Sequence, residues 1–355
     1  MPAHKRFYTE KQLSDKYDIS RHTSIKVVHE LENEGLLYRQ QGKGTFVRDQ
    51  EVEAKKYNIL LFVAEMTAEL PPEISYIHSE LVGGVIDELS KKHNATVSTI
   101  PQGVDETLFC IDRIQDPAID GVILMAYKNL KSLVTIARRC GKPYVLLNVK
   151  CDEKYAQSNN ILTNESQGMC DAVKYLYGLG HRNIAFLGNE RNALFLLNRK
   201  QGYMNGIIEC GISDSHIFDF FPENPKYSFN ELFKINPGVT GIVVANDEIA
   251  FELMNYCKMH DISVPDQLSI VGFNDATIAH LTQPKLTTVR KKRHEMGILA
   301  VHKMLNMLES GSLSIENTYI PAELIIRGST AEAPGGIFNT TKSINMEKEV
   351  LNISE

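Results

Sequence analysis

The fold of this chain is decided by the stretch Gly241-Ile242-Val243-Val244-Ala245-Asn246-Asp247-Glu248-Ile249-Ala250. Its apolar first half predicts a buried strand, and the polar pair Asn246-Asp247 then leads into a helix. Apolar runs of the same kind recur between helical stretches, at Ile59–Val63, Thr96–Ile100, Gly121–Met125, Tyr144–Leu147, Ile184–Leu187 and Leu268–Val271. Continuous apolar strands that alternate with helices are typical of parallel sheets covered on both faces, so an α/β body is expected.

The helix between the first two strands is clearly amphipathic. Ile77, Leu81, Val85 and Leu89 recur at every fourth position, which places them on one face of a helix. The body that begins here is long enough for two lobes, each with its own parallel sheet flanked by helices.

Composition narrows the class of protein. The 355 residues suggest two or three domains. Residues 1–56 hold 11 basic and 9 acidic side chains, whereas the rest holds 27 and 35, so a basic head precedes an acidic body. No apolar run is long enough to span a membrane, and the polar start argues against a secretion signal. The six cysteines form no CxxC pair, which favours reduced thiols in the cytoplasm.

Four regions are expected along the chain. Residues 1–48 form a small DNA-binding domain, and the charged stretch 49–56 is a linker. Residues 57–330 form a two-lobed domain for effector binding and dimerisation, and residues 331–355 form a C-terminal extension.

The head begins with two short helices. Thr9 is expected to cap a helix that reaches Tyr17, and Ser20 a second helix from Arg21 to Asn33, which Gly35 ends. Its inward positions are predicted to be Ile25, Val28 and Leu31. Two strands, Leu36–Arg39 and Thr45–Val47, then enclose a Gly-rich tip.

Polar side chains at the start of the second helix could reach base edges or phosphates in a major groove. They are Ser20, Arg21, His22 and Thr23. Lys43 at the hairpin tip could lie along a minor groove. The alternatives are an ordinary solvated cap and an ordinary hairpin turn, but the order helix, turn, helix, hairpin favours DNA binding.

The head resembles the GntR-type winged-helix domains. The resemblance covers Ser20-Arg21-His22-Thr23, then Glu30-Leu31-Glu32-Asn33-Glu34-Gly35-Leu36-Leu37-Tyr38 and Gln41-Gly42-Lys43-Gly44-Thr45-Phe46-Val47. It implies DNA contacts at Lys11, Arg21, Thr23 and the wing residues Gly42, Lys43 and Gly44. Ile25 stands where the family commonly has a second arginine. The helix of roughly twenty residues that usually opens such domains is apparently missing.

Amides and carboxylates follow several strands of the body directly, at Asn148, Asn246-Asp247 and Asn274-Asp275. Ligands of open α/β sheets bind beyond the carboxyl ends of the strands. Amides both donate and accept hydrogen bonds, as sugar hydroxyls do, so this pattern suits a polyol. The alternative is helix capping, which is expected of Asp247.

The body resembles the effector-binding domain of the LacI/GalR repressors. The resemblance covers about residues 57–330 and includes Leu179-Gly180-His181-Arg182-Asn183-Ile184-Ala185-Phe186-Leu187-Gly188, Asn198-Arg199-Lys200-Gln201-Gly202-Tyr203 and Val264-Pro265-Asp266. It implies a periplasmic-binding-protein-like fold and sugar contacts at Asn148, Arg199, Asn246 and Asn274, where the family usually has aspartate at the last. Asp275 is a further candidate contact. Phe220 or Phe221 could stack on the sugar, or simply pack in the core.

A GntR-type head on such a body resembles the arabinose-repressor subgroup. The resemblance implies a homodimeric transcription factor, most simply a repressor released from a palindromic operator by a monosaccharide. A pentose or deoxyhexose is expected, and an uncharged one because few cations besides Arg199 match the pocket positions. The family places lobe crossings near Ile161–Thr163, Val289–Lys291 and Tyr319–Pro321.

The sequence contains no catalytic signature, metal-ligand spacing or cofactor motif. His294-Glu295 is not followed by a histidine at metal spacing, and Gly42-Lys43-Gly44 does not open a helix after a buried strand. Two alternatives stay open. One is a NAD-type oxidoreductase, which would need GxGxxG after a strand, and the other is a regulator that senses a small molecule other than a sugar.

Overall fold

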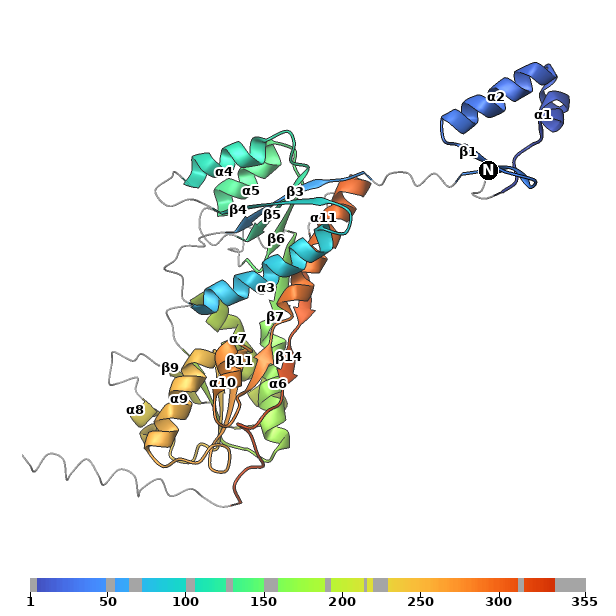
Figure 1. The fold of residues 1–355 in the computed structure, drawn as a ribbon. Helices are drawn as coiled ribbons and strands as arrows, with labels where there is room; N and C mark the ends of the chain where they lie inside the picture. Colours follow the sequence, from blue (N-terminus) through green and yellow to red (C-terminus); the bar gives the residue numbers. More distant parts are fainter. Residues whose placement is uncertain are drawn as a thin grey trace, which may run out of the picture. The chain divides into compact units, whose positions relative to one another are not determined.

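The computed structural model describes residues 5–48, 55–63, 72–99, 106–125, 130–149, 159–188, 193–213, 216–219, 229–311 and 316–335. The chain divides into two compact units, Met1–Tyr57 and Asn58–Glu355, which are called the head and the body (Figure 1). The expected linker 49–56 lies almost entirely outside the described residues, as do residues 336–355 of the expected C-terminal extension.

The head contains two helices and a hairpin. These are α1 (Glu10–Tyr17), α2 (Arg21–Asn33), β1 (Leu37–Gln40) and β2 (Gly44–Val47), with the strands antiparallel. Thr9 caps α1 in a capping box with Gln12, and Ser20 caps α2 by accepting from the Thr23 amide, as the sequence predicts. The arm before α1 pairs with the hairpin, because Phe7 donates to Thr45 and Val47 donates to Lys5.

The core of the head is small. Leu13, Val28 and Leu37 are its buried residues. The prediction that Ile25 faces inward is wrong, since its side chain is 42% exposed. Ser24 occupies the buried position one helical turn before Val28 and donates to the Ser20 carbonyl (3.2 Å), and this turns its neighbour Ile25 to the surface.

Lobe 1 of the body is built on a six-stranded parallel sheet in the order β13-β7-β6-β5-β3-β4. The strands are β3 (Asn58–Val63), β4 (Asn94–Thr99), β5 (Gly121–Met125), β6 (Tyr144–Leu147), β7 (Asn160–Asn164) and β13 (Thr318–Pro321). Helices α4 (Glu106–Gln115) and α5 (Leu130–Arg139) cover one face, and α3 (Pro72–Leu89) and α11 (Arg293–Ser310) cover the other (Figure 1).

Lobe 2 has a second six-stranded sheet in the order β14-β12-β11-β10-β8-β9, parallel except for β14. Its strands are β8 (Ile184–Gly188), β9 (His216–Asp219), β10 (Gly241–Val244), β11 (Ser269–Asn274), β12 (Thr287–Arg290) and β14 (Glu323–Ile325). Helices α6 (Glu165–Gly178) and α7 (Ala193–Glu209) cover one face. Helices α8 (Phe229–Ile235), α9 (Asp247–Met259) and α10 (Thr277–Leu281) cover the other.

The predicted amphipathic helix is α3, and it packs closely on α11. Leu81, Val85 and Leu89 are fully buried, as expected, whereas the side chain of Ile77 lies outside the described set. A Cβ atom on Gly84 would lie 2.1 Å from the His294 carbonyl oxygen, so the two backbones can approach this closely only at glycine.

The chain crosses between the lobes at the three predicted places. Strand β7 of lobe 1 leads into α6 of lobe 2, β12 of lobe 2 leads into α11 of lobe 1, and β13 of lobe 1 leads into β14 of lobe 2. Just after the body's expected end at residue 330, the Ala333 amide still donates to the Leu179 carbonyl of lobe 2 (2.8 Å). The first residues of the expected extension are therefore part of this lobe.

Candidate functional site

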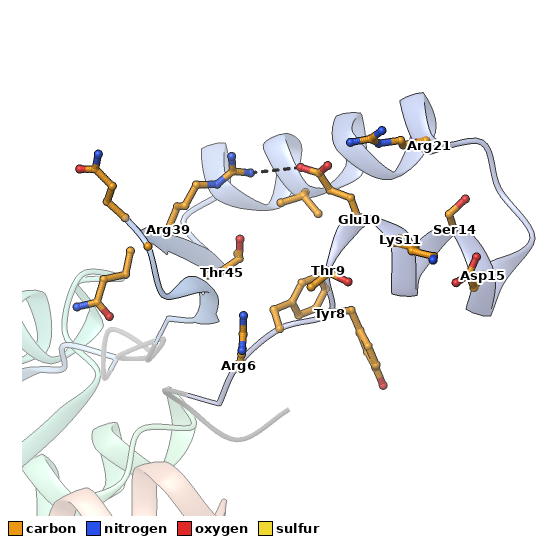
Figure 2. A pocket seen from close by; sticks show the side chains of 16 residues that line it. Arg6, Tyr8, Thr9, Glu10, Lys11, Ser14, Asp15, Arg21, Arg39 and Thr45 are labelled. Carbon is orange, nitrogen blue, oxygen red and sulfur yellow. Dashed lines mark ion pairs between the residues drawn. The ribbon is translucent and has the colours of Figure 1, made fainter.

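The head carries a hollow of about 750 Å³ between the arm, α1, the start of α2 and the hairpin (Figure 2). Four basic and two acidic side chains line it, namely Arg6, Lys11, Arg21 and Arg39 with Glu10 and Asp15. Glu10 lies 3.9 Å from Arg39, which also pairs with Glu32 (3.1 Å). The side chains that line the hollow therefore carry a net positive charge, which suits the binding of a polyanion.

The structure gathers half of the predicted DNA contacts around this hollow. Lys11, Arg21, Gly42 and Gly44 all belong to its lining. The other four predicted contacts are exposed: His22 and Lys43, and the pair Ser20 and Thr23. The hydroxyls of that pair lie 2.8 Å apart and bond to each other at the helix cap, so these two side chains serve the helix start.

The hairpin tip requires glycine at two positions. Gly42 has φ +77° and Gly44 has φ +113°, conformations that other residues adopt only with strain. The Lys43 amide donates to the Gln40 carbonyl (3.0 Å) and closes the turn, which leaves the exposed Lys43 side chain at the tip. A Cβ on Gly44 would lie 3.0 Å from Nε of Arg6, so the arm packs directly on the hairpin.

In the body, Arg199 of α7 is buried at the carboxyl edge of the lobe 2 sheet. Its guanidinium carbon Cζ lies over the Phe273 ring, 4.1 Å from the centroid. It donates through Nε and Nη2 to the two carboxylate oxygens of Glu165, both at 3.3 Å, and through Nη1 to the Ala245 carbonyl. Nη2 also lies 3.4 Å from Oδ1 of Asn274. Arg199 and Asn274, both predicted sugar contacts, are thus neighbours.

Glu165 and Lys291 connect this cluster to lobe 1. Lys291 Nζ donates to Glu165 Oε1 at 2.7 Å and to Asn148 Oδ1 at 3.3 Å. Asn148 follows β6 of lobe 1 and adopts φ 55°. Glu165 follows the first lobe crossing and Lys291 the second, so one buried ion pair joins two crossings and links the predicted contact of lobe 1 to that of lobe 2.

Burial and the neighbouring charges shift the pKa values of Glu165 and Lys291 in opposite directions. Burial raises the pKa of Glu165, but the charges of Arg199 and Lys291 outweigh it and bring the pKa down to about 2. Burial lowers the pKa of Lys291 to about 8, and the carboxylate of Glu165 opposes part of that change. Glu165 is therefore a firmly ionised carboxylate that holds two buried cations.

The expected capping role of Asp247 is wrong, because Asn246 is the residue that caps α9. Asn246 Oδ1 accepts from the Ile249 amide at 2.8 Å, so this predicted sugar contact has a structural role as well. Asp247 is instead fully buried and accepts from the Thr288 hydroxyl (2.6 Å) and the Ala276 amide (2.7 Å). Burial raises the pKa of Asp247 to about 7, against these two hydrogen bonds.

The two residues after β11 have unusual backbones and different surroundings. Asn274 has φ 116° and Asp275 has φ 52°. The Asp275 carboxylate is engaged by Arg290 and Arg327, each at 2.6 Å. Asn274 thus contacts the Arg199 cluster, whereas both carboxylate oxygens of Asp275 are held in ion pairs.

Glu165, Lys291 and Arg293 are members of this cluster that sequence reasoning missed. The available signal was charge next to the lobe crossings, where Lys291-Lys292-Arg293 follows the strand Thr287–Arg290. The predicted stacking residues Phe220 and Phe221 lie outside the described residues. Within the described ranges, no three His, Cys, Asp or Glu residues are grouped as a metal site, and no helix is long and apolar enough to cross a membrane.

Comparison with known proteins agrees with this architecture. A family model of the periplasmic binding protein-like domain matches residues 173–330. The chain is 29% identical to the arabinose metabolism transcriptional repressor of Halalkalibacterium halodurans, over 93% of this chain and 92% of the relative. It is 28% identical to the protein of the same name from Geobacillus stearothermophilus, over 94% and 93%.

Among solved structures, the cellobiose complex of the transcriptional regulator CelR matches with a TM-score of 0.63 at 19% identity. The match covers 91% of this chain and 100% of that chain. The body therefore has the two-lobed periplasmic-binding-protein-like α/β fold, and relatives aligned over nearly the whole chain are transcriptional repressors.

Proposed function

We propose that this protein is a sugar-responsive transcriptional repressor, whose head binds operator DNA and whose body binds a monosaccharide between its lobes. The observation that carries the proposal is the meeting of Asn148 from lobe 1 and Arg199 from lobe 2 through Lys291 and Glu165 at the chain crossings. A ligand that contacts both sides favours one arrangement of the lobes through its differential affinity. Through a dimer, that preference changes the affinity of the heads for DNA.

The chemistry of the cluster supports a sugar effector. The amides of Asn148 and Asn274 can bond to sugar hydroxyls, and Arg199, whose other donors bond to Glu165, Asn274 and the Ala245 carbonyl, has one Nη1–H left for a further hydroxyl. The names of the relatives refer to arabinose metabolism, and a pentose or deoxyhexose fits the same set of donors and acceptors.

The head is a winged-helix domain of the GntR type in this proposal. Its support is the hairpin that follows the second helix, the arm paired with that hairpin, and the positive hollow lined by Lys11 and Arg21. Residues 1–48 form this domain and residues 49–56 link it to the body. A homodimer in the cytoplasm then presents two heads to a palindromic operator.

Two measurements on the full chain test the proposal. A thermal-shift screen with L-arabinose, D-ribose, D-xylose, L-fucose and sugar acids should find a stabilising sugar, since ligand at about 100 times its Kd adds about 2.7 kcal/mol. Gel shifts on genomic fragments should find a DNA site that the same sugar releases. Stabilisation by a purine or an amino acid in place of a sugar would overturn the effector class. DNA binding of equal strength to all fragments would overturn the regulator.

A further inference from the structure

Arg293, the first residue of α11, holds buried hydrogen-bond donors that have no acceptor. Its side chain is 2% exposed. Nη1 donates to Glu80 Oε2 of α3 and to the Asn274 carbonyl, both at 3.1 Å. Nε and Nη2 are buried and have no hydrogen-bond partner among the residues that the structure describes. Buried donors of this kind are nearly always satisfied in native proteins, so the two atoms indicate a missing acceptor.

The geometry of these donors selects the acceptor. Nε–H and Nη2–H lie in the guanidinium plane and point in parallel from one of its edges, here called the Nε–Nη2 face, and this edge binds a carboxylate through both oxygens. Arg293 contacts the carbonyl of Asn274, while Arg199 contacts the side chain of the same residue. The free face therefore belongs to the cluster proposed to bind the effector.

The charges around this cluster favour an acid over an uncharged group. Three buried cations, Arg199, Lys291 and Arg293, face two carboxylates, the buried Glu165 and the half-buried Glu80, among the described residues. Among the described residues the buried cations thus outnumber the carboxylates, and the buried Nε and Nη2 of Arg293 lack an acceptor, which is unfavourable away from water. An anionic ligand would supply that acceptor.

We infer that the effector is an acidic monosaccharide, whose carboxylate binds the Nε–Nη2 face of Arg293 while its hydroxyls bind Arg199 and Asn148. This inference rests on the proposed sugar-sensing function and specifies its ligand. The expectation of an uncharged sugar assumed that Arg199 is almost the only cation at the effector site. Lys291 and Arg293 are further buried cations of this cluster, so that assumption does not hold. A phosphate ester offers oxygens of similar geometry, so the experiment separates the two acids.

The test is calorimetric titration of the full-length protein with matched ligands. D-Galactose is compared with D-galacturonate, and D-glucose with D-glucuronate, D-gluconate and glucose 6-phosphate. In at least one set the carboxylate should bind ten times more tightly than its uncharged counterpart. Tighter binding of the uncharged sugar, or of L-arabinose than of any acid, would overturn the inference and leave the sugar sensor intact. Tightest binding of the phosphate ester would overturn the carboxylate assignment. Failure of every sugar to bind would overturn both proposals.

Variants locate the carboxylate. Arg293→Met should lower the affinity for the acid at least tenfold, and Arg293→Lys, which keeps the charge but lacks the fork, should lower it less. The matched control is Arg290→Met, which removes a nearby positive charge that is paired with Asp275. It should change the affinity less than threefold. Circular dichroism shows whether each variant is folded, and the comparison of ligands on the unaltered protein tests the acid by itself. Equal affinity of Arg293→Met and the unaltered protein for the acid would refute the assignment.

Discussion

Replacement of Glu165 by glutamine should destabilise the body markedly. Its carboxylate accepts from Arg199 at 3.3 Å and from Lys291 at 2.7 Å, out of contact with water. The fall in pKa from the ordinary value of 4.5 to about 2 corresponds to about 3 kcal/mol of stabilisation at neutral pH. Mutants that break one side of a buried ion pair lose a similar amount, about 3–5 kcal/mol.

The partner cation determines how much of this loss can be recovered. Burial already lowers the pKa of Lys291 to about 8 in the presence of Glu165, so in Glu165→Gln the lysine should lose its proton near neutral pH. The double variant Glu165→Gln, Lys291→Met removes both charges and should therefore be more stable than the single variant. Double-mutant analysis then gives the coupling between the two side chains.

Thermal unfolding followed by circular dichroism is a suitable assay, because the chain has no tryptophan. A loss of about 3 kcal/mol should lower the melting temperature of the body by about 5 °C at pH 7. The effect also has a defined pH dependence. The stabilisation by Glu165 is complete above about pH 4.5 and is lost as the pH falls towards about 2, so the two proteins should converge in acid. A single variant as stable as the unaltered protein at pH 7 would refute the reasoning.

Three further predictions follow from the sites. Arg199→Ala should cost about 1.5–3 kcal/mol of effector affinity by calorimetry while gel shifts show unchanged operator binding, giving a non-inducible protein. Arg21→Ala should blur sequence preference, whereas Lys43→Ala should weaken all DNA equally and flatten the salt dependence, as gel shifts at two salt concentrations would show. The raised pKa of Asp247 means that stability falls as the pH rises from about 4 through about 7. In thermal melts Asp247→Asn should therefore be the more stable protein at pH 8.5, and this advantage should shrink as the pH falls and vanish near pH 4.

The parts of the fold that could be predicted are the elements whose burial requires a recognisable pattern of apolar residues. Central strands such as Gly121–Met125 are enclosed on both faces, so every residue is apolar and the run is visible without any partner. The sequence does not indicate the strands His216–Asp219 and Glu323–Ile325, because both lie at sheet edges, where polar residues are tolerated and no continuous apolar run is required. The inward position of Ile25 was predicted from its spacing of three residues from Val28. The buried position is instead that of Ser24, four residues before Val28, whose hydroxyl bonds to its own helix and so can be buried.

The site was predictable only where a residue follows a strand or matches a family position, as Asn148 and Arg199 do. The burial of charge at the crossings depends on contacts between distant parts of the chain. Lys291 and Arg293 are buried while Lys292 between them is not, because the chain turns there from a strand of one lobe into a helix of the other. In the sequence the three form an ordinary basic run. Lys291 becomes a site residue only through Glu165, 126 positions earlier, and Arg293 only through the carbonyl of Asn274 and the carboxylate of Glu80. The partners of charged residues at lobe crossings, and therefore their function, can be assigned only when the topology of the fold is known.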